Sequence, residues 1–424
     1  MIMRILLYGI NYAPELTGIG KYTGEMAEWL AERGHDVHVL TAMPYYPEWE
    51  VHSKYKGNIW HTERIEGVNV HRVPLYVPKE VSVMKRIMHE FSFLLSTIPF
   101  WLRFLVEKKF DVVFCIAPPF HLSIAPWLYN MLKPGIRINH IQDLQVDAAR
   151  DLGMIKNKRF LDIMFALELF FLKKGTRVST ISGGMQKKIL NKGIAAGDMF
   201  FFPNWVDSKT IFPLPKEESL RQDMGFNMFD KIVLYSGNLG EKQGLDAIIR
   251  IAERFTLQSE VKFVICGSGG AKDNLRQQAD SAGLENVFFF PLQPYEKLSR
   301  LLAIADLHLV LQKGSAADLV MPSKLTGILA AGGCALVTAN PGTALYEVIK
   351  EHDMGILVPP DDESALGEGI TQGLYGGSTQ IKKNARDYAE QYLDKKQILL
   401  SLERELQALM RERIMKRRID YKKA

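Results

Sequence analysis

Short runs of β-branched and aromatic residues alternate with helical patterns along nearly the whole chain, and this alternation constrains the fold most strongly. Apolar runs that are separated by helices are typical of parallel strands covered on both faces. The runs cover residues 4–10, 37–41, 111–117, 137–143 and 177–182, then 231–237, 261–267, 287–290, 307–312, 335–339 and 355–358. We therefore predict an α/β protein with two doubly wound domains.

The length of the chain also favours two domains, because 424 residues exceed what one hydrophobic core usually supports. Several prolines between Pro203 and Pro215 interrupt the periodicity and mark the division. We expect a first domain over residues 1–206, a second over 207–394 and a C-terminal segment over 395–424. The segment 404–424 carries the whole net charge of +5, which leaves the main body neutral and argues against nucleic-acid binding.

The composition and the three cysteines predict a cytoplasmic protein. No apolar stretch reaches the roughly 20 residues that a membrane-spanning helix requires, and the N-terminus lacks the pattern of a signal peptide. Cys115, Cys266 and Cys334 are far apart and lie inside apolar runs. Buried thiols explain them better than disulfides or a metal site.

The junction after the first run contains Gly18 and Gly20 and leads into a helix. Glycines permit close backbone approach, and a helix N-terminus favours an anion. A flexible turn is the alternative, since two glycines alone are weak evidence. A nicotinamide cofactor is disfavoured, because Thr23 replaces the third glycine of the dinucleotide fingerprint and the second run ends at Thr41 without an acid.

The run over residues 137–143 delivers polar side chains to the edge of the sheet where ligands bind. Asp143 stands at its carboxyl end and is the candidate for a polar active-site group. His140 is interpreted as a hydrogen-bonded core histidine rather than a catalytic one.

In the second half, the turn over residues 236–244 contains Asn238 and Lys242 before a helix, an arrangement that suits a pyrophosphate. Gly267 opens a glycine-rich junction that either admits a base or ribose or tightens the turn. Pro322 and Ser323 begin another helix, and Lys324 follows close to its N-terminus. A cation there opposes the helix dipole, so its charge makes sense if it meets an anion.

Taken together, several segments resemble retaining glycosyltransferase family 4, and the resemblance covers nearly the whole chain. The segments that carry it are residues 12–22, 34–35, 181–185, 203–207, 237–244 and 322–324. Their order and spacing are specific, although each is unremarkable alone. Within the family the chain looks most like the colanic-acid-type fucosyltransferases of bacterial polysaccharide synthesis.

The resemblance implies a GT-B fold, in which two Rossmann-like domains face a central cleft. It implies an acceptor domain first, a sugar-nucleotide domain second, and a last helix that crosses back to the first. It implies no metal and no cofactor besides the nucleotide-diphosphate sugar as co-substrate. The donor-binding residues expected on both grounds are Gly18, Gly20, Asn238, Lys242, Gly267, Pro322, Ser323 and Lys324.

The sequence also departs from the family pattern. Asn238 stands where an arginine is usual, Gln243 stands where a lysine is usual, and Lys242 is one position earlier. The second glutamate of the Glu-x(7)-Glu element falls on Gly327. The position of the common catalytic histidine falls near Asp143, so a carboxylate is expected to take its place. The predicted donor site therefore relies on lysines and backbone amides.

The expected reaction is retaining transfer of a sugar, with GDP-fucose as the first choice of donor, to a lipid-linked polysaccharide repeat. Transfer from a UDP-sugar such as a UDP-N-acetyl-amino sugar, a sugar-nucleotide epimerase and a non-catalytic nucleotide-binding partner are the alternatives. The segments 84–109 and 160–174 combine apolar residues at helical spacing with basic flanks. Such helices lie either on a membrane surface at the inner leaflet or against the core, and the pattern leaves both readings open.

Overall fold

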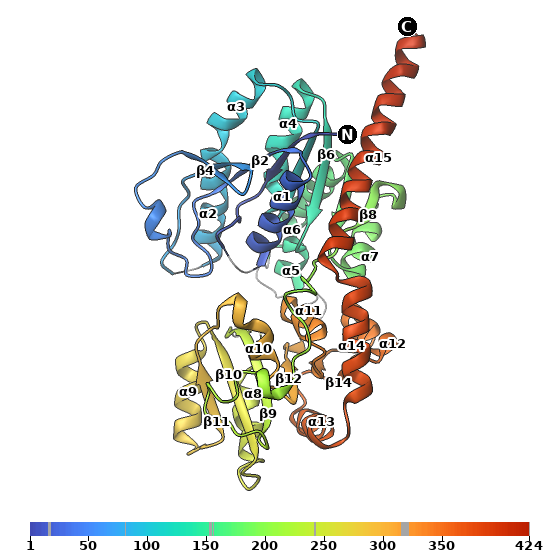
Figure 1. Ribbon diagram of the computed structural model, residues 1–424. Helices are drawn as coiled ribbons and strands as arrows, with labels where there is room; N and C mark the ends of the chain where they lie inside the picture. Colours follow the sequence, from blue (N-terminus) through green and yellow to red (C-terminus); the bar gives the residue numbers. More distant parts are fainter. Residues whose placement is uncertain are drawn as a thin grey trace. The chain divides into compact units, whose positions relative to one another are not determined.

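The computed structural model describes residues 1–15, 18–80, 82–151, 155, 157–240, 243–314 and 322–423. The chain forms two compact units (Figure 1). The first comprises Met1–Pro203 with Leu399–Ala424, and the second comprises Asn204–Ile398. Each contains a mainly parallel sheet with helices, so the predicted α/β class with two doubly wound parts is confirmed.

The first unit is built on an eight-stranded sheet in the order β3-β4-β2-β1-β5-β6-β7-β8. The strands are β1 (Arg4–Tyr8), β2 (Asp36–Ala42), β3 (His61–Ile65), β4 (Val68–Val73), β5 (Val112–Ala117), β6 (Ile136–Ile141), β7 (Arg177–Thr180) and β8 (Met199–Phe201). Strands β5 and β6 are buried along their whole length, because helices cover both faces of the sheet centre.

Eight α-helices accompany this sheet among the described residues. They are α1 (Gly18–Glu32), α2 (Val83–Ser96), α3 (Ile98–Val106), α4 (Ile124–Leu132), α5 (Gln145–Asp151), α6 (Lys158–Lys173), α7 (Gly183–Asn191) and most of α15 (Lys395–Lys423). Serines and an asparagine cap three of them: Ser82 on α2, Asn157 on α6 and Ser182 on α7 each accept a backbone N–H of the first turn. A short 3-10 turn, η2 (Phe120–Ser123), precedes α4.

The hairpin of β3 and β4 was not expected, and the prediction of parallel strands alone is wrong at this edge. Strand β3 pairs antiparallel with β4. Its residues alternate between half-buried and exposed, as befits an edge strand, so it lacks the apolar run that marks a central one. Glu66 and Gly67 both have positive φ, which is the two-residue turn that joins hairpin strands.

The second unit has a six-stranded parallel sheet in the order β11-β10-β9-β12-β13-β14. The strands are β9 (Lys231–Asn238), β10 (Val261–Ser268), β11 (Val287–Phe290), β12 (Leu307–Val310), β13 (Ala335–Thr338) and β14 (Ile356–Val358). The helices are α8 (Asp246–Glu253), α9 (Lys272–Ser281), α10 (Leu298–Leu302), α11 (Ser323–Ala330), α12 (Ala344–His352), α13 (Glu363–Tyr375) and α14 (Thr379–Tyr392).

Both faces of this second sheet carry a hydrophobic core. On β9, Val233 and Tyr235 belong to one buried cluster, whereas Ile232 and Leu234 belong to another on the opposite face. Alternation along the strand sends successive side chains to opposite faces, which explains why the run reads as apolar throughout.

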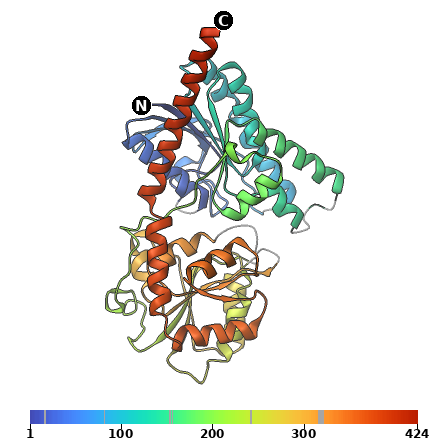
Figure 2. The ribbon, with the colours of Figure 1, turned by 90° about the vertical axis from the view of Figure 1, so that its right-hand side faces the viewer.

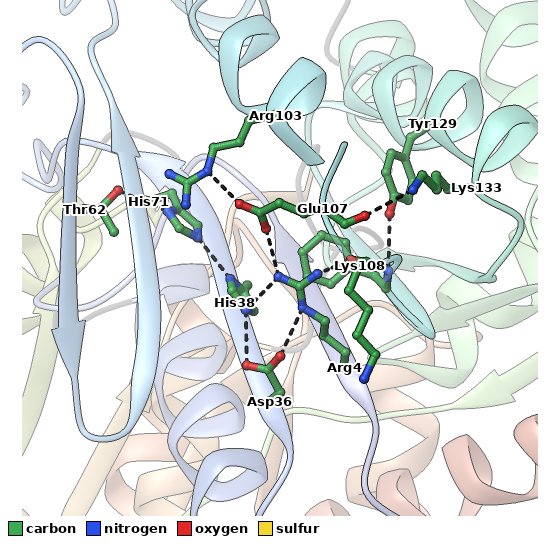
Figure 3. Close-up of polar contacts among 11 residues, drawn as sticks. Arg4, Asp36, His38, Thr62, His71, Arg103, Glu107, Lys108, Tyr129 and Lys133 are labelled. Carbon is green, nitrogen blue, oxygen red and sulfur yellow. Dashed lines mark hydrogen bonds and ion pairs between the residues drawn. The ribbon is translucent and has the colours of Figure 1, made fainter. Parts of the chain in front are cut away.

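A polar network closes the amino end of the first sheet (Figure 3). Arg4 at the start of β1 pairs with Asp36 at 3.0 Å and with Glu107 at 2.9 Å. Its guanidinium also lies 3.4 Å from His38 Nε2, and His38 Nδ1 lies 3.1 Å from His71 Nε2. This network stands at the end of the sheet opposite to the carboxyl edge, so we assign it a structural role.

Candidate functional site

The second sheet has its topological switch point between β9 and β12. From β9 the chain continues to β10 on one side, while β12 lies on the other. Ligands of open α/β sheets bind beyond the carboxyl ends of the strands at such a point. The end of β9 at Gly237 and Asn238, together with the start of α11, is therefore the candidate ligand site of the second unit.

Gly237 and Lys324 lie in contact at this point. Gly237 has a φ of 133°, and a Cβ there would stand 3.2 Å from Lys324 Cε and 3.3 Å from Lys324 Nζ. Any larger residue at position 237 would displace the lysine. The glycine is therefore required both by its backbone conformation and by the side chain that lies over it.

The Nζ atom of Lys324 is buried and has no hydrogen-bond partner among the described residues. It lies 3.4 Å from the centroid of the Tyr235 ring. Burial lowers the pKa of the Lys324 ammonium from 10.5 to about 7. Burying an ammonium near the positive end of a helix without a counter-charge is unfavourable, so this arrangement favours an anion as the missing partner.

Tyr235 contacts both the end of β9 and the first turn of α11, and sequence analysis did not single it out. Its hydroxyl donates a 2.7 Å hydrogen bond to the backbone oxygen of Asn238, while its ring face covers Lys324 Nζ. The signal in the sequence was an aromatic residue two positions before Gly237. That signal is weak, because a buried aromatic on a strand is ordinarily a core residue.

Gly267 on β10 is held against Gly237 by strand pairing. A Cβ at Gly267 would overlap the carbonyl oxygen of Gly237, so the structure gives this glycine a packing role. Asn238 is exposed at the end of β9, Pro322 is half-buried, and Ser323 is exposed in the first turn of α11. These four predicted residues, Gly267, Asn238, Pro322 and Ser323, therefore belong with Lys324 to one edge of the second sheet. Their contact with a donor stays a prediction.

Two predicted positions lie outside the described residues. One is Lys242, the predicted phosphate-binding lysine. The other is Leu319, which stands at the first glutamate position of the Glu-x(7)-Glu element. Gly327, at the second glutamate position, is described and lies within α11. It brings no carboxylate to the site, which agrees with the departure read from the sequence.

In the first unit, Gly18 and Gly20 lie in the first turn of α1, and a glycine is required at each for a different reason. Gly18 has a φ of 59°, and nothing lies within 4 Å of where its Cβ would be. A Cβ on Gly20 would instead stand 2.8 Å from the Cβ of Glu15 and 2.9 Å from its Oε2. Gly18 thus supplies a left-handed turn, and Gly20 makes room for a buried carboxylate.

That carboxylate, Glu15, is a residue that sequence analysis missed. It lies between the ends of β1 and β2, and it accepts hydrogen bonds from Asn11 Nδ2 at 2.9 Å and from the backbone N–H groups of Tyr45 and Tyr46 at 3.1 Å. Loss of hydration raises the pKa of Glu15, although these donors oppose the shift. Buried carboxylates at the ligand-binding edge of a sheet are candidates for function.

Asp143 follows β6 by two residues and is partly buried. His140, on β6 itself, is fully buried, and its Nδ1 lies 2.9 Å from Ser179 Oγ. Complete burial lowers the pKa of His140 to about 3, which supports the interpretation as a core histidine. Asp143, Gly18 and Gly20 therefore share the carboxyl edge of the first sheet, in a different unit from Lys324.

The chain matches two protein families along most of its length. Residues 17–205 match the Glycosyl transferase 4-like domain, and residues 216–391 match Glycosyl transferases group 1. The chain is 43% identical over 404 residues to the putative colanic acid biosynthesis glycosyl transferase WcaI of Escherichia coli K12, a match that covers 94% of this chain and 98% of the relative. The chain belongs to glycosyltransferase family 4.

More distant proteins share the fold of this glycosyltransferase. Sucrose-phosphate synthase from Thermosynechococcus elongatus superposes with a TM-score of 0.73 at 16% identity, covering 97% of this chain and all of the other. HepE from Anabaena, in complex with UDP and glucose, superposes with a TM-score of 0.68 at 15% identity, covering 96% and 99%. These likenesses confirm the predicted GT-B fold.

A family 4 assignment makes the glycosyltransferase a member of a retaining family, as the sequence predicted. Within the described residues, no helix combines the length and the apolar character needed to cross a membrane.

Proposed function

We propose that this glycosyltransferase moves a sugar, with retention of configuration and without a metal ion, from GDP-fucose to a lipid-linked repeat of a bacterial exopolysaccharide at the cytoplasmic face of a membrane. Residues 207–394 hold the donor, residues 1–206 hold the acceptor, and residues 395–424 return to the acceptor domain. The similarity to WcaI, whose name refers to colanic acid biosynthesis, supports the class of product.

The observation that carries the donor assignment is the buried ammonium of Lys324 beside Gly237, which has no hydrogen-bond partner in the described part of the chain. In the proposed reaction the bond between the sugar and the diphosphate breaks, and a bond to the acceptor oxygen forms on the same face. The charge that develops on the diphosphate meets Lys324, Lys242 and the backbone amides near Asn238, Gly267, Pro322 and Ser323.

The acceptor's proton passes to an oxygen of the leaving diphosphate, so Asp143 is not needed as a base. Its carboxylate orients hydroxyl groups of the acceptor or of the sugar, and it stabilises the positive charge that develops on the sugar ring. Gly18 and Gly20 shape the turn before α1 at the same edge of the first sheet.

The experiment that tests the proposal combines binding with turnover. A thermal-shift panel of GDP, UDP, GDP-fucose and UDP-N-acetylglucosamine identifies the base and the sugar. Release of nucleoside diphosphate in the presence of a lipid-linked glycan then measures transfer. Lys324→Met is expected to reduce the thermal shift strongly. Lys231→Met is the matched control, because Lys231 also lies near a tyrosine ring, 5.7 Å from that of Tyr375, but at the amino end of β9.

Other donors and reactions are outcomes of the same experiment. A shift with UDP-sugars alone would favour the UDP-sugar alternative, for which HepE, bound to UDP and glucose, is a structural precedent. Epimerised nucleotide in the absence of acceptor would indicate an epimerase, which membership of a transferase family disfavours. Tight binding without any release of diphosphate would indicate a non-catalytic partner. Lys242→Ala is expected to reduce transfer sharply while the protein stays folded.

A further inference from the structure

Helix α2 carries apolar side chains on its outer face as well as on its inner one. Its inner face is accounted for by the core, since Phe93 is fully buried. On the outer face, Met84, Met88, Phe91 and Leu95 are exposed, and 62% of Leu95 is accessible. Their spacing of three or four residues places them on one stripe of the helix. Packing against the core does not explain this second stripe.

Helix α3 continues the same pattern. Phe104 is fully buried on its inner face, whereas Ile98, Leu102 and Val106 recur every four residues on its outer face. Leu102 is 61% exposed and Val106 is 85% exposed. The sequence left open whether the apolar residues of segment 84–109 face the core or a membrane surface. The inner stripes of α2 and α3 face the core, and the outer stripes do not.

Two neighbouring helices add exposed apolar residues of the same kind. On α4 they are Leu128, Met131 and Leu132, and on α6 they are Phe160, Ile163, Leu167 and Phe170. The helices adjoin one another through ring contacts. Trp101 of α3 lies 5.5 Å from Tyr129 of α4, and Trp127 of α4 lies 5.4 Å from Phe170 of α6. The ribbons of these helices belong to the first unit (Figures 1 and 2).

We call the outer faces of α2, α3, α4 and α6 the apolar helix surface. It holds nearly half of the large apolar side chains that are exposed among the described residues. Such a concentration in one region of a folded protein marks an interaction site rather than ordinary surface variation.

Basic residues stand at the ends of these helices. Lys158 and Arg159 begin α6, Lys173 and Lys174 end it, and all four are exposed. Exposed Arg86 lies in the first turn of α2, while exposed Arg103 and Lys108 lie at the end of α3 or just beyond it. Helix α4 has no charged residue of its own. Arg86 and Arg103 are each paired with a glutamate, Glu90 and Glu107. Apolar helix faces with basic ends fit an interface in which acyl chains meet the apolar stripe and anionic headgroups meet the lysines.

We propose that the apolar helix surface docks the protein on an anionic lipid bilayer, with the four helices lying in the headgroup region. A second copy of the chain is a less suitable occupant of this surface. Lysine is depleted in the buried core of protein interfaces, whereas exposed lysines stand at both ends of α6. The proposal goes beyond the donor chemistry and does not depend on it, since it rests on a different set of residues.

A flotation assay with vesicles tests the docking surface. The full chain is expected to float with vesicles of phosphatidylethanolamine and phosphatidylglycerol, and not with phosphatidylcholine alone. The double variant Leu95→Asp/Leu102→Asp should weaken binding about tenfold or more, because two apolar anchors are lost. Leu257→Asp is the matched control, since Leu257 is 97% exposed but belongs to the second unit.

The charges are tested separately with Lys173→Glu/Lys174→Glu, which should reduce binding to anionic vesicles and remove part of its salt dependence. Failure of the wild type to float, or equal flotation of Leu95→Asp/Leu102→Asp, would overturn the proposal. A wild-type dimer in light scattering that this double variant disrupts, without vesicle binding, would assign the surface to a second copy. Nucleotide binding measured in the same variants separates this outcome from failure of the donor assignment.

Discussion

The ammonium of Lys324 lies 3.4 Å from the ring centroid of Tyr235 and has no hydrogen-bond partner among the described residues. A cation over an aromatic face gains about 2 kcal/mol when both are shielded from water, which replaces only part of the hydration that a buried ammonium loses. Tyr235 also donates to the backbone oxygen of Asn238, so one side chain holds the lysine and shapes the turn beside it. The pair is well suited to receive an anion.

Because Lys324 is costly to bury, its removal should stabilise the fold while it damages the site. We expect Lys324→Met to leave the free energy of unfolding unchanged or to raise it by about 1 kcal/mol, since an uncompensated buried charge is replaced by an apolar chain. Transfer should fall by about 100-fold or more, the usual loss when one positioned donor to a developing anion is removed. Denaturant unfolding and release of nucleoside diphosphate measure the two effects. A marked loss of stability would mean that Lys324 has a structural partner.

The lowered pKa of Lys324 predicts that affinity for a nucleoside diphosphate depends on pH. The charged ammonium binds the diphosphate, and in the free protein its pKa is about 7. Above that pH the free lysine is neutral and must take up a proton on binding, so affinity should weaken by about tenfold per pH unit until the pKa of the bound state is reached. Isothermal titration calorimetry of GDP and UDP at several pH values, in buffers of different ionisation enthalpy, measures both slope and proton uptake. The same slope in Lys324→Met would contradict this assignment.

Sequence patterns predicted the central strands well, because those strands are buried on both faces and so are apolar throughout. The observed β6, for example, ends at Ile141 within the predicted run over residues 137–143. Strands β3, β4 and β8 were not predicted. The edge strands β3 and β8 are half-exposed or short, so composition does not separate them from loops. Strand β4 lies inside the sheet, but Asn69, His71 and Arg72 interrupt its apolar run.

The candidate site was predictable only in part. Lys324 stood out because a cation at a helix N-terminus is misplaced on stability grounds. Tyr235 and Glu15 did not stand out, because their roles depend on contacts between segments far apart in the chain. The apolar stripes of α2 were visible in the sequence, but a helix that is apolar on two faces does not reveal which face meets the core.

Gly267 should tolerate no side chain, because strand pairing brings it against the carbonyl of Gly237. Gly267→Ala must push β10 away from β9, and we expect a loss of about 3 kcal/mol in the free energy of unfolding. Gly270→Ala is the control, since nothing lies within 4 Å of where its Cβ would be. Chemical denaturation of both variants measures the difference. Equal stability of the two would show that the strands are less closely paired than described.

The buried pair of His38 and His71 should make the first unit sensitive to acid (Figure 3). Burial, then the nearby His38 and Arg103, lower the pKa of His71 from 6.5 to about 4, against the opposing effect of Glu107. Between about pH 6.5 and pH 4, His71 is therefore protonated in the unfolded chain but neutral in the folded protein. The stability contributed by neutral His71 is complete above pH 6.5 and is lost as the pH falls toward 4, by roughly 3 kcal/mol in all.

The variant His71→Gln tests this contribution, because glutamine keeps polar contacts to His38 and Thr62 but does not titrate. We expect the free energy of unfolding of His71→Gln to fall less steeply between about pH 6.5 and 4 than that of the wild type. His52→Gln serves as the control, since His52 is exposed in a loop of the same unit. Unfolding by denaturant at a series of pH values gives the slopes. Parallel slopes for His71→Gln and the wild type would place the acid sensitivity at other buried histidines, such as His140, whose pKa burial lowers to about 3.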